Sequence, residues 1–241
     1  MIKFSFILII GLLCISCIDD SLFDSGPVKT KTVLLDDFNV IEVENTFELE
    51  LVSDTTNKIE IVCGEKLFED IEIAIKDGIL SLDHHLTAKW SRNYSKIILR
   101  LHSKPFERIN IRKPAKVFNS DVYKGNSFSL IDWGKFSEVD LTLNVEYCLI
   151  AMSSDNFGQF KIKGKAVSAN LWGWGSANVR ADSLITENCE VLHRGMGDVY
   201  VKAQNHLKVD MQFTGNIFYS GNPSEITIVQ RLGTGNIYKL N

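Results

Sequence analysis

The chain has 241 residues, with 26 Lys and Arg against 30 Asp and Glu and a formal net charge of −4. Its hydrophobic content of 45% and its 4 prolines are typical of a folded protein and exclude extended disorder. Nucleic-acid binding depends on clustered basic side chains that neutralise phosphates, so the mild acidity excludes that class. The length suits one large all-β domain or two small ones.

The first sixteen residues have the features of a bacterial lipoprotein signal peptide. Lys3 supplies a basic start, and residues 4–13 form an apolar run that is too short to span a bilayer core of ~30 Å as a helix. The stretch 13–17 resembles a lipoprotein cleavage site, because small Ser16 precedes Cys17. The resemblance implies that Cys17 becomes the lipidated N-terminus and anchors the protein to a membrane. An ordinary cleaved secretory signal is the alternative.

Residues 17–30 predict an acidic tether between this anchor and a folded body at 31–241. Asp19 and Asp20 lie just after Cys17. Acidic residues in this place resemble a signal that some Gram-negative bacteria use to send lipoproteins to the outer face of the outer membrane. We therefore expect a protein of the cell surface, with the periplasmic face as the alternative.

The first part of the body predicts several half-buried strands, because apolar and charged residues alternate. A helical turn or two is expected over 64–71, and Lys76-Asp77-Gly78 between two alternating runs predicts a hairpin. The polar and aromatic stretch 83–95 predicts a loop, and 96–102 predicts a strand. The expected strands before the hairpin are 32–35, 38–43, 47–51 and 58–63.

The last third of the chain repeats one short glycine-containing pattern. The second glycines of successive turns stand at 175, 197, 215 and 235, and each turn leads into alternating β-branched or aromatic residues. A period near twenty with two strands per period is typical of a solenoid. Less regular turns at 113–115, 133–135 and 155–158 extend the series backwards, so 106–241 predicts six or seven coils.

The sequence therefore predicts an all-β fold: a single-chain parallel β-helix with coils of about twenty residues and a strand-rich N-terminal segment. Glycine and asparagine in the turns are interpreted as residues that adopt positive φ at little steric cost. The glycines expected to form the turns are Gly173, Gly175, Gly195, Gly197, Gly215, Gly233 and Gly235.

These features together resemble the auto-transporter adhesin, head GIN domain family. The resemblance rests on the openings 38–43 and 47–51, on 76–80, and on the recurrent Gly-x-Gly-(Asp/Asn)-Val/Ile turns. It covers 38–241 and implies a single-chain β-helix in an envelope or surface protein of Gram-negative bacteria. The chain departs from the pattern before residue 173, where the Gly-x-Gly turns weaken.

Three cysteines of the body, Cys63, Cys148 and Cys189, have apolar neighbours and are expected to be buried thiols. Cys148 and Cys189 lie about two periods apart. Equivalent positions two rungs apart are separated by ~9.6 Å, which is too far for a disulfide.

A polysaccharide-cleaving β-helix needs a pair of carboxylates, and Glu138 and Asp140 are the candidates for such a pair. Residues two apart on a strand face the same side. Lys161 and Lys163 occupy the equivalent region one rung later, so charge compensation between rungs explains the carboxylates more simply. No catalytic residue is predicted.

Metal binding is not predicted either. His84 and His85 are adjacent, and on a strand they would point to opposite faces, so a solvated loop is the favoured interpretation. Calcium-binding β-rolls repeat every nine residues with an acid in each turn, whereas the acid appears here at Asp198 alone among the glycine turns. No cofactor is expected.

The best binding candidates are Trp133, Trp172, Trp174 and Arg194, with Asp132 and Asn178 as flanking polar groups. Exposed indoles beside polar groups suit a glycan or a partner protein. Trp133 lies two periods before Trp174, and Trp172 shares a face with Trp174. The alternative is that the tryptophans fill the core.

We therefore expect a non-catalytic surface adhesin or binding module for glycan or protein. A structural envelope protein that self-associates through an uncapped last rung at 237–240 is the alternative, which would make the protein a homo-oligomer. A polysaccharide-acting enzyme comes third.

Overall fold

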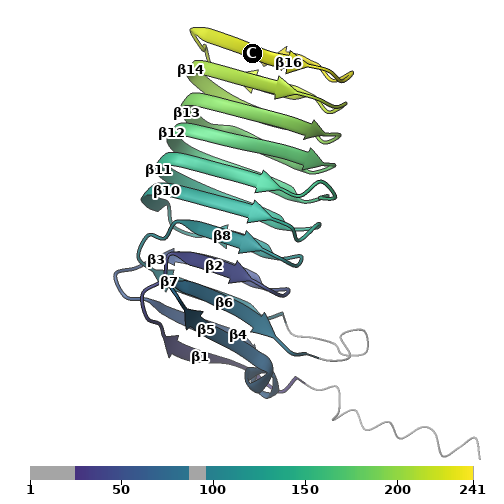
Figure 1. Ribbon diagram of the computed structural model, residues 1–241. Helices are drawn as coiled ribbons and strands as arrows, with labels where there is room; N and C mark the ends of the chain where they lie inside the picture. Colours follow the sequence, from purple (N-terminus) through teal and green to yellow (C-terminus); the bar gives the residue numbers. More distant parts are fainter. Residues whose placement is uncertain (1–24, 87–95, 241) are drawn as a thin grey trace, which may run out of the picture.

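The protein is an all-β solenoid of about seven turns that rises from a curled, mixed N-terminal sheet (Figure 1). The computed structural model describes residues 25–86 and 96–240. The N-terminal elements are β1 (Val28–Leu34), β2 (Val40–Val43), β3 (Glu48–Ser53), β4 (Lys58–Gly64), the 3₁₀ helix η3 (Glu65–Asp70), β5 (Ile71–Lys76), β6 (Ile79–His84), β7 (Ile98–Ser103), β8 (Arg108–Ile111) and β9 (Lys116–Asn119). The regular coils hold β10 (Tyr123–Asp132), β11 (Glu138–Met152), β12 (Gln159–Gly175), β13 (Asn178–Gly195), β14 (Val199–Met211), β15 (Ile217–Ser220), β16 (Glu225–Arg231) and β17 (Ile237–Lys239).

Parallel pairing stacks the regular coils, with local register shifts in the pairings of β12 with β13, β13 with β14 and β14 with β16. Phe128, Cys148, Ala169, Cys189 and Leu207 align on five successive rungs. All five point inward and are buried, so each rung completes an apolar column that no single rung could bury alone. The predicted parallel β-helix with coils of about twenty residues is confirmed. The sequence predicted two separate strands in each period, but β11 to β14 each continue through a corner as one strand.

The first coil lies out of sequence order. β2 pairs in parallel with both β6 and β8, and β3 pairs in parallel with both β7 and β9. The strands made earliest therefore sit between strands that follow them in the chain. No local pattern in the sequence indicated this arrangement.

Antiparallel strands close the N-terminal end. β1 pairs with β4, β4 pairs with β7, and β5 pairs with β6. The predicted hairpin is confirmed, and both Asp77 (φ 52°) and Gly78 (φ 76°) adopt the left-handed conformation that its tight turn requires. The helical segment predicted over 64–71 is η3. The tether predicted over 17–30 is wrong at its end, because β1 begins at Val28 and pairs along its whole length.

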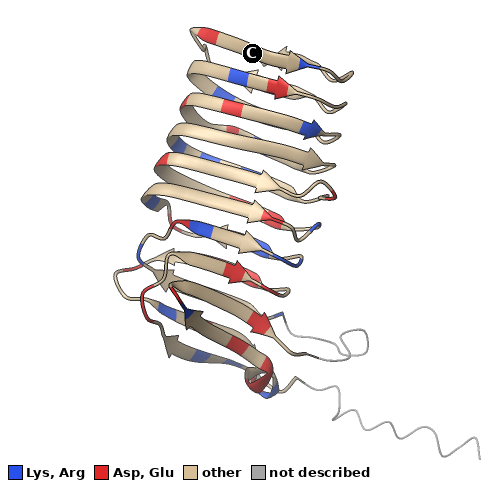
Figure 2. Cartoon of the chain, viewed as in Figure 1, with Lys and Arg blue, Asp and Glu red and all other residues tan. Residues whose placement is uncertain are grey.

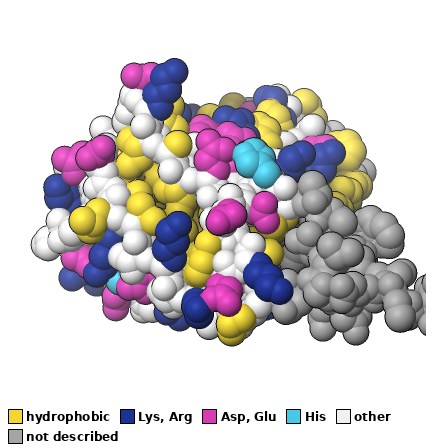
Figure 3. All heavy atoms as spheres, turned by 90° about the horizontal axis from the view of Figure 1, so that it is seen from below, with side chains coloured by type: hydrophobic (Ala, Val, Ile, Leu, Met, Phe, Trp, Pro, Cys, Tyr) yellow, Lys and Arg dark blue, Asp and Glu magenta, His cyan; other side chains and the backbone are white. Residues whose placement is uncertain are grey.

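Seen from below, this end shows hydrophobic side chains between charged ones (Figure 3). Half-buried hydrophobics of β1, η3 and β5 pack there against the core. The antiparallel strands thus cover much of the apolar column that the lowest coil would otherwise expose.

The interpretation of the turn glycines as positive-φ residues is wrong for most of them. Among the seven, Gly175 alone has a positive φ, of 68°. All the others except Gly173 are required because backbone approaches backbone: a Cβ on Gly197 would lie 1.9 Å from the carbonyl oxygen of Ala177, and one on Gly215 would lie 2.1 Å from that of Gly197. Gly173 lies within β12 and not in a turn, where it faces inward against His193.

The asparagines of the turns bind the rung above or below. The side-chain oxygen of Asn178 accepts the backbone N–H of Asp198, Asp198 accepts that of Asn216, and Asn216 accepts that of Asn236, each at 3.0 Å. This ladder satisfies turn amides that the strands cannot reach.

Acidic and basic residues are interspersed along the rungs (Figure 2). Within residues 25–86 and 96–240, no helix has the length and apolar character needed to cross a membrane.

Candidate functional site

Register brings the predicted tryptophans to one corner of the solenoid. The backbone N–H of Trp133 binds the carbonyl of Ile111, and that of Ser153 binds the carbonyl of Asp132. Trp174 pairs directly with Arg194. Arg112, Trp133, Ser153, Trp174 and Arg194 therefore occupy the same position on five successive rungs, and we call this set the corner column. Trp133 and Trp174 lie two rungs apart, as their sequence spacing predicted.

Each tryptophan of the corner column lies beside an arginine from the adjacent outer rung. The Arg112 guanidinium lies 4.2 Å from the ring centre of Trp133, and the Arg194 guanidinium lies 5.7 Å from that of Trp174. Trp133 is 38% exposed, whereas Trp174 is half-buried and packs against the core. Such cation–π contacts hold each indole in place and also restrict the motion of the arginine side chain.

Beside the corner column lies an apolar outer patch, formed by Ile131, Leu149, Ala151, Trp172 and Leu192. These residues face outward on β10 to β13, and Trp172 is 38% exposed. Ala151 faces outward yet is 5% exposed, because its neighbours, which include its register partner Trp172, cover it. Trp172 and Trp174 share a face as predicted, since buried Gly173 separates them.

Paired polar groups border the outer patch below and above. On the N-terminal side, Glu42 accepts hydrogen bonds from Asn110 and Arg112. On the C-terminal side, Asp210 binds Gln212 and Gln230, at 2.9 and 3.1 Å. An apolar centre with a satisfied polar border is the usual anatomy of a binding surface on a rigid scaffold.

Asp132 and Asn178, the two polar groups expected to flank this site, bind other parts of the protein instead. Asp132 is fully buried, where its carboxylate accepts hydrogen bonds from the Gly134 amide (2.6 Å), the Ser137 hydroxyl (3.0 Å) and the Asn156 side chain (2.8 Å). Burial raises the pKa of Asp132, and these hydrogen bonds oppose the rise. Asn178 belongs to the turn ladder. The Asp132 side chain is therefore not available to a ligand, and the side-chain oxygen of Asn178 is already bound.

Sequence reasoning missed Arg112 and Ser153 as members of the corner column. The signal was present, because both stand about one period from a predicted tryptophan. It went unused because the early turns lack the Gly-x-Gly pattern that marks the later rungs.

Glu138 and Asp140 face the same side of β11, as predicted. Asp140 forms ion pairs with Lys163 (2.5 Å) and Lys161 (3.8 Å), so the predicted compensation between rungs is present. The arrangement resembles a charge ladder more than an acid and base held apart for catalysis.

The solvated loop that the sequence suggested is wrong for His84, whereas His85 lies beyond the strand and is exposed. His84 ends β6, is 4% exposed, and packs edge-on against Phe47 with ring centres 5.2 Å apart. His85 binds Glu72 at 2.9 Å, and this hydrogen bond raises the pKa of the imidazole. Residues 25–86 and 96–240 hold no group of three potential metal ligands. Trp90, in the predicted loop, lies outside the described residues.

Cys63, Cys148 and Cys189 are buried free thiols, as predicted. Cys148 and Cys189 align through Ala169 and so lie two rungs apart. Burial raises the pKa of the Cys63 thiol to about 11 and those of Cys148 and Cys189 to about 12, which leaves all three inert as nucleophiles at neutral pH.

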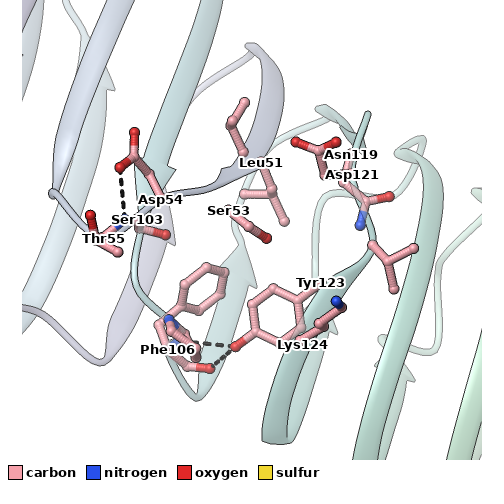
Figure 4. A pocket seen from close by; sticks show the side chains of 13 residues that line it. Leu51, Ser53, Asp54, Thr55, Ser103, Phe106, Asn119, Asp121, Tyr123 and Lys124 are labelled. Carbon is pink, nitrogen blue, oxygen red and sulfur yellow. Dashed lines mark hydrogen bonds between the residues drawn. The ribbon is translucent and has the colours of Figure 1, made fainter.

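A hollow of ≈ 760 Å³ lies where β3 and β7 end and β10 begins (Figure 4). The Tyr123 hydroxyl accepts the Phe106 amide and donates to the Phe106 carbonyl, and burial raises the pKa of Tyr123 to about 12. Asp54 accepts the amides of Thr55 and Thr56. Since these polar groups already hold the local backbone, the hollow is a weaker candidate than the outer patch.

The last rung has features that oppose strand pairing with another chain. Arg231 and Lys239 align with inward-facing Met211 and Tyr219, so charges occupy the end of the core. Val229 is an extra residue in the register of β16. Inward charges and bulges both discourage edge-to-edge pairing. The self-association expected at this end stays a prediction, and these features count against it.

A family model described as "Putative auto-transporter adhesin, head GIN domain" matches residues 37–223. The chain belongs to this family. Among solved structures, a putative adhesin from Bacteroides fragilis matches with a TM-score of 0.81 at 21% identity, over 89% of this chain and 97% of that one. Putative adhesins from Parabacteroides distasonis and Parabacteroides merdae match with TM-scores of 0.66 and 0.61, at 21% and 20% identity. They cover 89% and 90% of this head GIN chain, and 98% and 97% of their own. No curated protein matches the sequence.

Proposed function

We propose that this head GIN protein is a lipid-anchored, non-catalytic adhesin of the outer membrane that binds a glycan or a protein through its outer patch. The observation that carries the proposal is the cluster of exposed indoles, at Trp133 and Trp172, on a rigid wall of paired strands. Contiguous apolar patches on a protein surface, unlike single exposed hydrophobics, often mark binding sites.

Rigidity supports this assignment. The indoles project from continuous strands, whose register is fixed by pairing on both sides. A ligand therefore meets a surface that needs little ordering, and tryptophans in such surroundings contribute most of the binding energy at protein interfaces. Membership of an adhesin family agrees with a binding role and with the absence of a predicted catalytic pair.

Replacement of the central indole provides the first test. We expect Trp172→Ala to lower attachment of cells that carry the full chain to glycan-coated and protein-coated surfaces by at least about tenfold, because an anchor of this kind contributes about 2 kcal/mol or more. Attachment is scored per copy of surface protein. Tyr238→Ala is the matched control, since Tyr238 is 45% exposed on a different wall of the solenoid. Equal attachment by Trp172→Ala and unaltered cells would remove the outer patch from the proposal.

Anchoring is tested separately through Cys17. We expect Cys17→Ala to release the protein from the membrane fraction, because a thioether-linked lipid cannot form on alanine. Protease added to intact cells is expected to digest the unaltered protein, which places the solenoid outside. Digestion only after the envelope is broken would place it in the periplasm, and membrane retention of Cys17→Ala would contradict lipidation.

A further inference from the structure

The residues of the corner column follow a symmetric order along the solenoid, and this order has no role in binding through the outer patch. Its five rungs read Arg, Trp, Ser, Trp, Arg, from Arg112 to Arg194. The two arginines belong to the outer rungs, and their guanidinium groups lie over the tryptophans, 4.2 and 5.7 Å from the ring centres. Each indole thus has its guanidinium contact from an outer rung, and Ser153 lies on the rung between the two indoles.

Spacing along the solenoid leaves room for one ring between these indoles. Rings at one register position on successive rungs stack in this molecule: Tyr200 and Phe218 have ring centres 4.6 Å apart, and Phe218 and Tyr238 have ring centres 5.2 Å apart. Trp133 and Trp174 are two rungs apart, or ~9.6 Å. The rung between them carries Ser153, whose side chain has no ring, so the stack has a gap at this position.

Polar groups surround this middle position. The Ser153 hydroxyl donates to Asp155 at 3.0 Å, and Lys135 pairs with Asp155 at 2.7 Å. Both members of that ion pair are more than half exposed. Lys135 and Asp155 lie in the turns that follow Trp133 and Ser153, two residues further along the chain in each case.

We propose that Trp133 and Trp174 hold one pyranose ring of a glycan between them, above Ser153. The inference rests on the proposed binding function and names its ligand class. A pyranose has C–H faces that stack on indoles and hydroxyl groups around its edge, which Ser153, Asp155 and Lys135 can bind. An aromatic side chain of a partner protein would stack as well, but its ring edge carries at most one hydroxyl group for Ser153, Asp155 and Lys135 to bind.

The sharpest test fills the gap with the protein's own ring. Ser153→Phe places a phenyl ring at the middle rung, where it continues the stack as Phe218 does between its two tyrosines. Ser129→Phe is the matched control, because Ser129 also faces outward on the same wall but lies in another column. Binding of the full-length protein is measured by saturation-transfer NMR and tryptophan fluorescence. The probes are methyl glycosides of a hexose, an N-acetylhexosamine and a uronic acid, with N-acetyl-phenylalanine amide as the aromatic probe.

We expect at least one glycoside to bind the unaltered protein and Ser129→Phe, and Ser153→Phe to lose at least about tenfold in affinity with its unfolding midpoint unchanged. Binding of the aromatic amide without any glycoside would overturn the ligand class. Full glycoside binding by Ser153→Phe, together with loss in Trp172→Ala, would overturn the gap but leave the outer patch intact. Failure of every probe to bind, with attachment still dependent on Trp172, would overturn the pyranose proposal alone.

Discussion

A Gly197→Val substitution is expected to prevent the upper coils from stacking. A Cβ at this position would lie 1.9 Å from the carbonyl oxygen of Ala177, and both partners are backbone atoms that cannot swing aside. A Cβ on the next glycine of the ladder, Gly215, would lie 2.1 Å from the Gly197 carbonyl oxygen, so a displaced turn at Gly197 would also disturb the rung above it. We expect a loss beyond about 4 kcal/mol, the range of severe core disruption, measured by chemical unfolding.

Two further variants separate close approach from backbone conformation. Gly197→Asn is expected to be nearly as damaging as Gly197→Val, although asparagine is the residue that best tolerates positive φ after glycine. Gly78→Asn is expected to be mild, because Gly78 has φ 76° and a Cβ there would meet nothing within 4 Å. A stable Gly197→Asn protein would show that the contact is not what requires glycine.

The second large effect is expected at Asp132. Its carboxylate accepts three hydrogen bonds inside the corner, from Gly134, Ser137 and Asn156. Asp132→Asn replaces one acceptor oxygen by an amide that must face a donor, and each buried group left without a partner costs about 1–3 kcal/mol. We expect a destabilisation of that order. Ser129→Asn, a polar substitution on the outer face of the same strand, serves as the control.

The same substitution is expected to change how stability depends on pH. Burial raises the pKa of Asp132 above its ordinary value of 3.8, so the folded state holds its proton to a higher pH than the unfolded state does. The contribution of this group is therefore fully present below 3.8 and is lost as the pH rises through the folded pKa. The stability difference between the unaltered protein and Asp132→Asn should shrink across that window. A difference that grows with pH would mean that the hydrogen bonds outweigh burial.

Patterns that repeat along the chain predicted the regular coils well. Turns near 133, 155, 175 and 197 lie where a period of twenty placed them, because each rung repeats the same local problem of reversing direction. The chemistry of the turns was only partly predicted. The close backbone approach at the glycines and the side-chain ladder from Asn178 are contacts between neighbouring rungs. They cannot be predicted from the sequence of one turn alone.

The candidate site shows the same division. Alternation on a strand correctly placed Trp172 and Trp174 on one face, and period counting placed Trp133 two rungs away. The burial of Asp132 was not predicted, because its side chain points inward to bind a turn in its own coil and another in the next. His84 was misplaced for a related reason: it ends a strand whose neighbour, β2, comes from forty residues earlier.

The position of β2 and β3 between later strands has a consequence for the order in which the molecule can be completed. During synthesis these strands emerge first, but Glu42 finds its partners Asn110 and Arg112 only about seventy residues later. Contacts this distant form slowly, whereas neighbouring coils from β10 onward can add to one another one at a time. β2 and β3 therefore wait for β8 and β9 during synthesis, and until then their unpaired edges need protection from association with other chains.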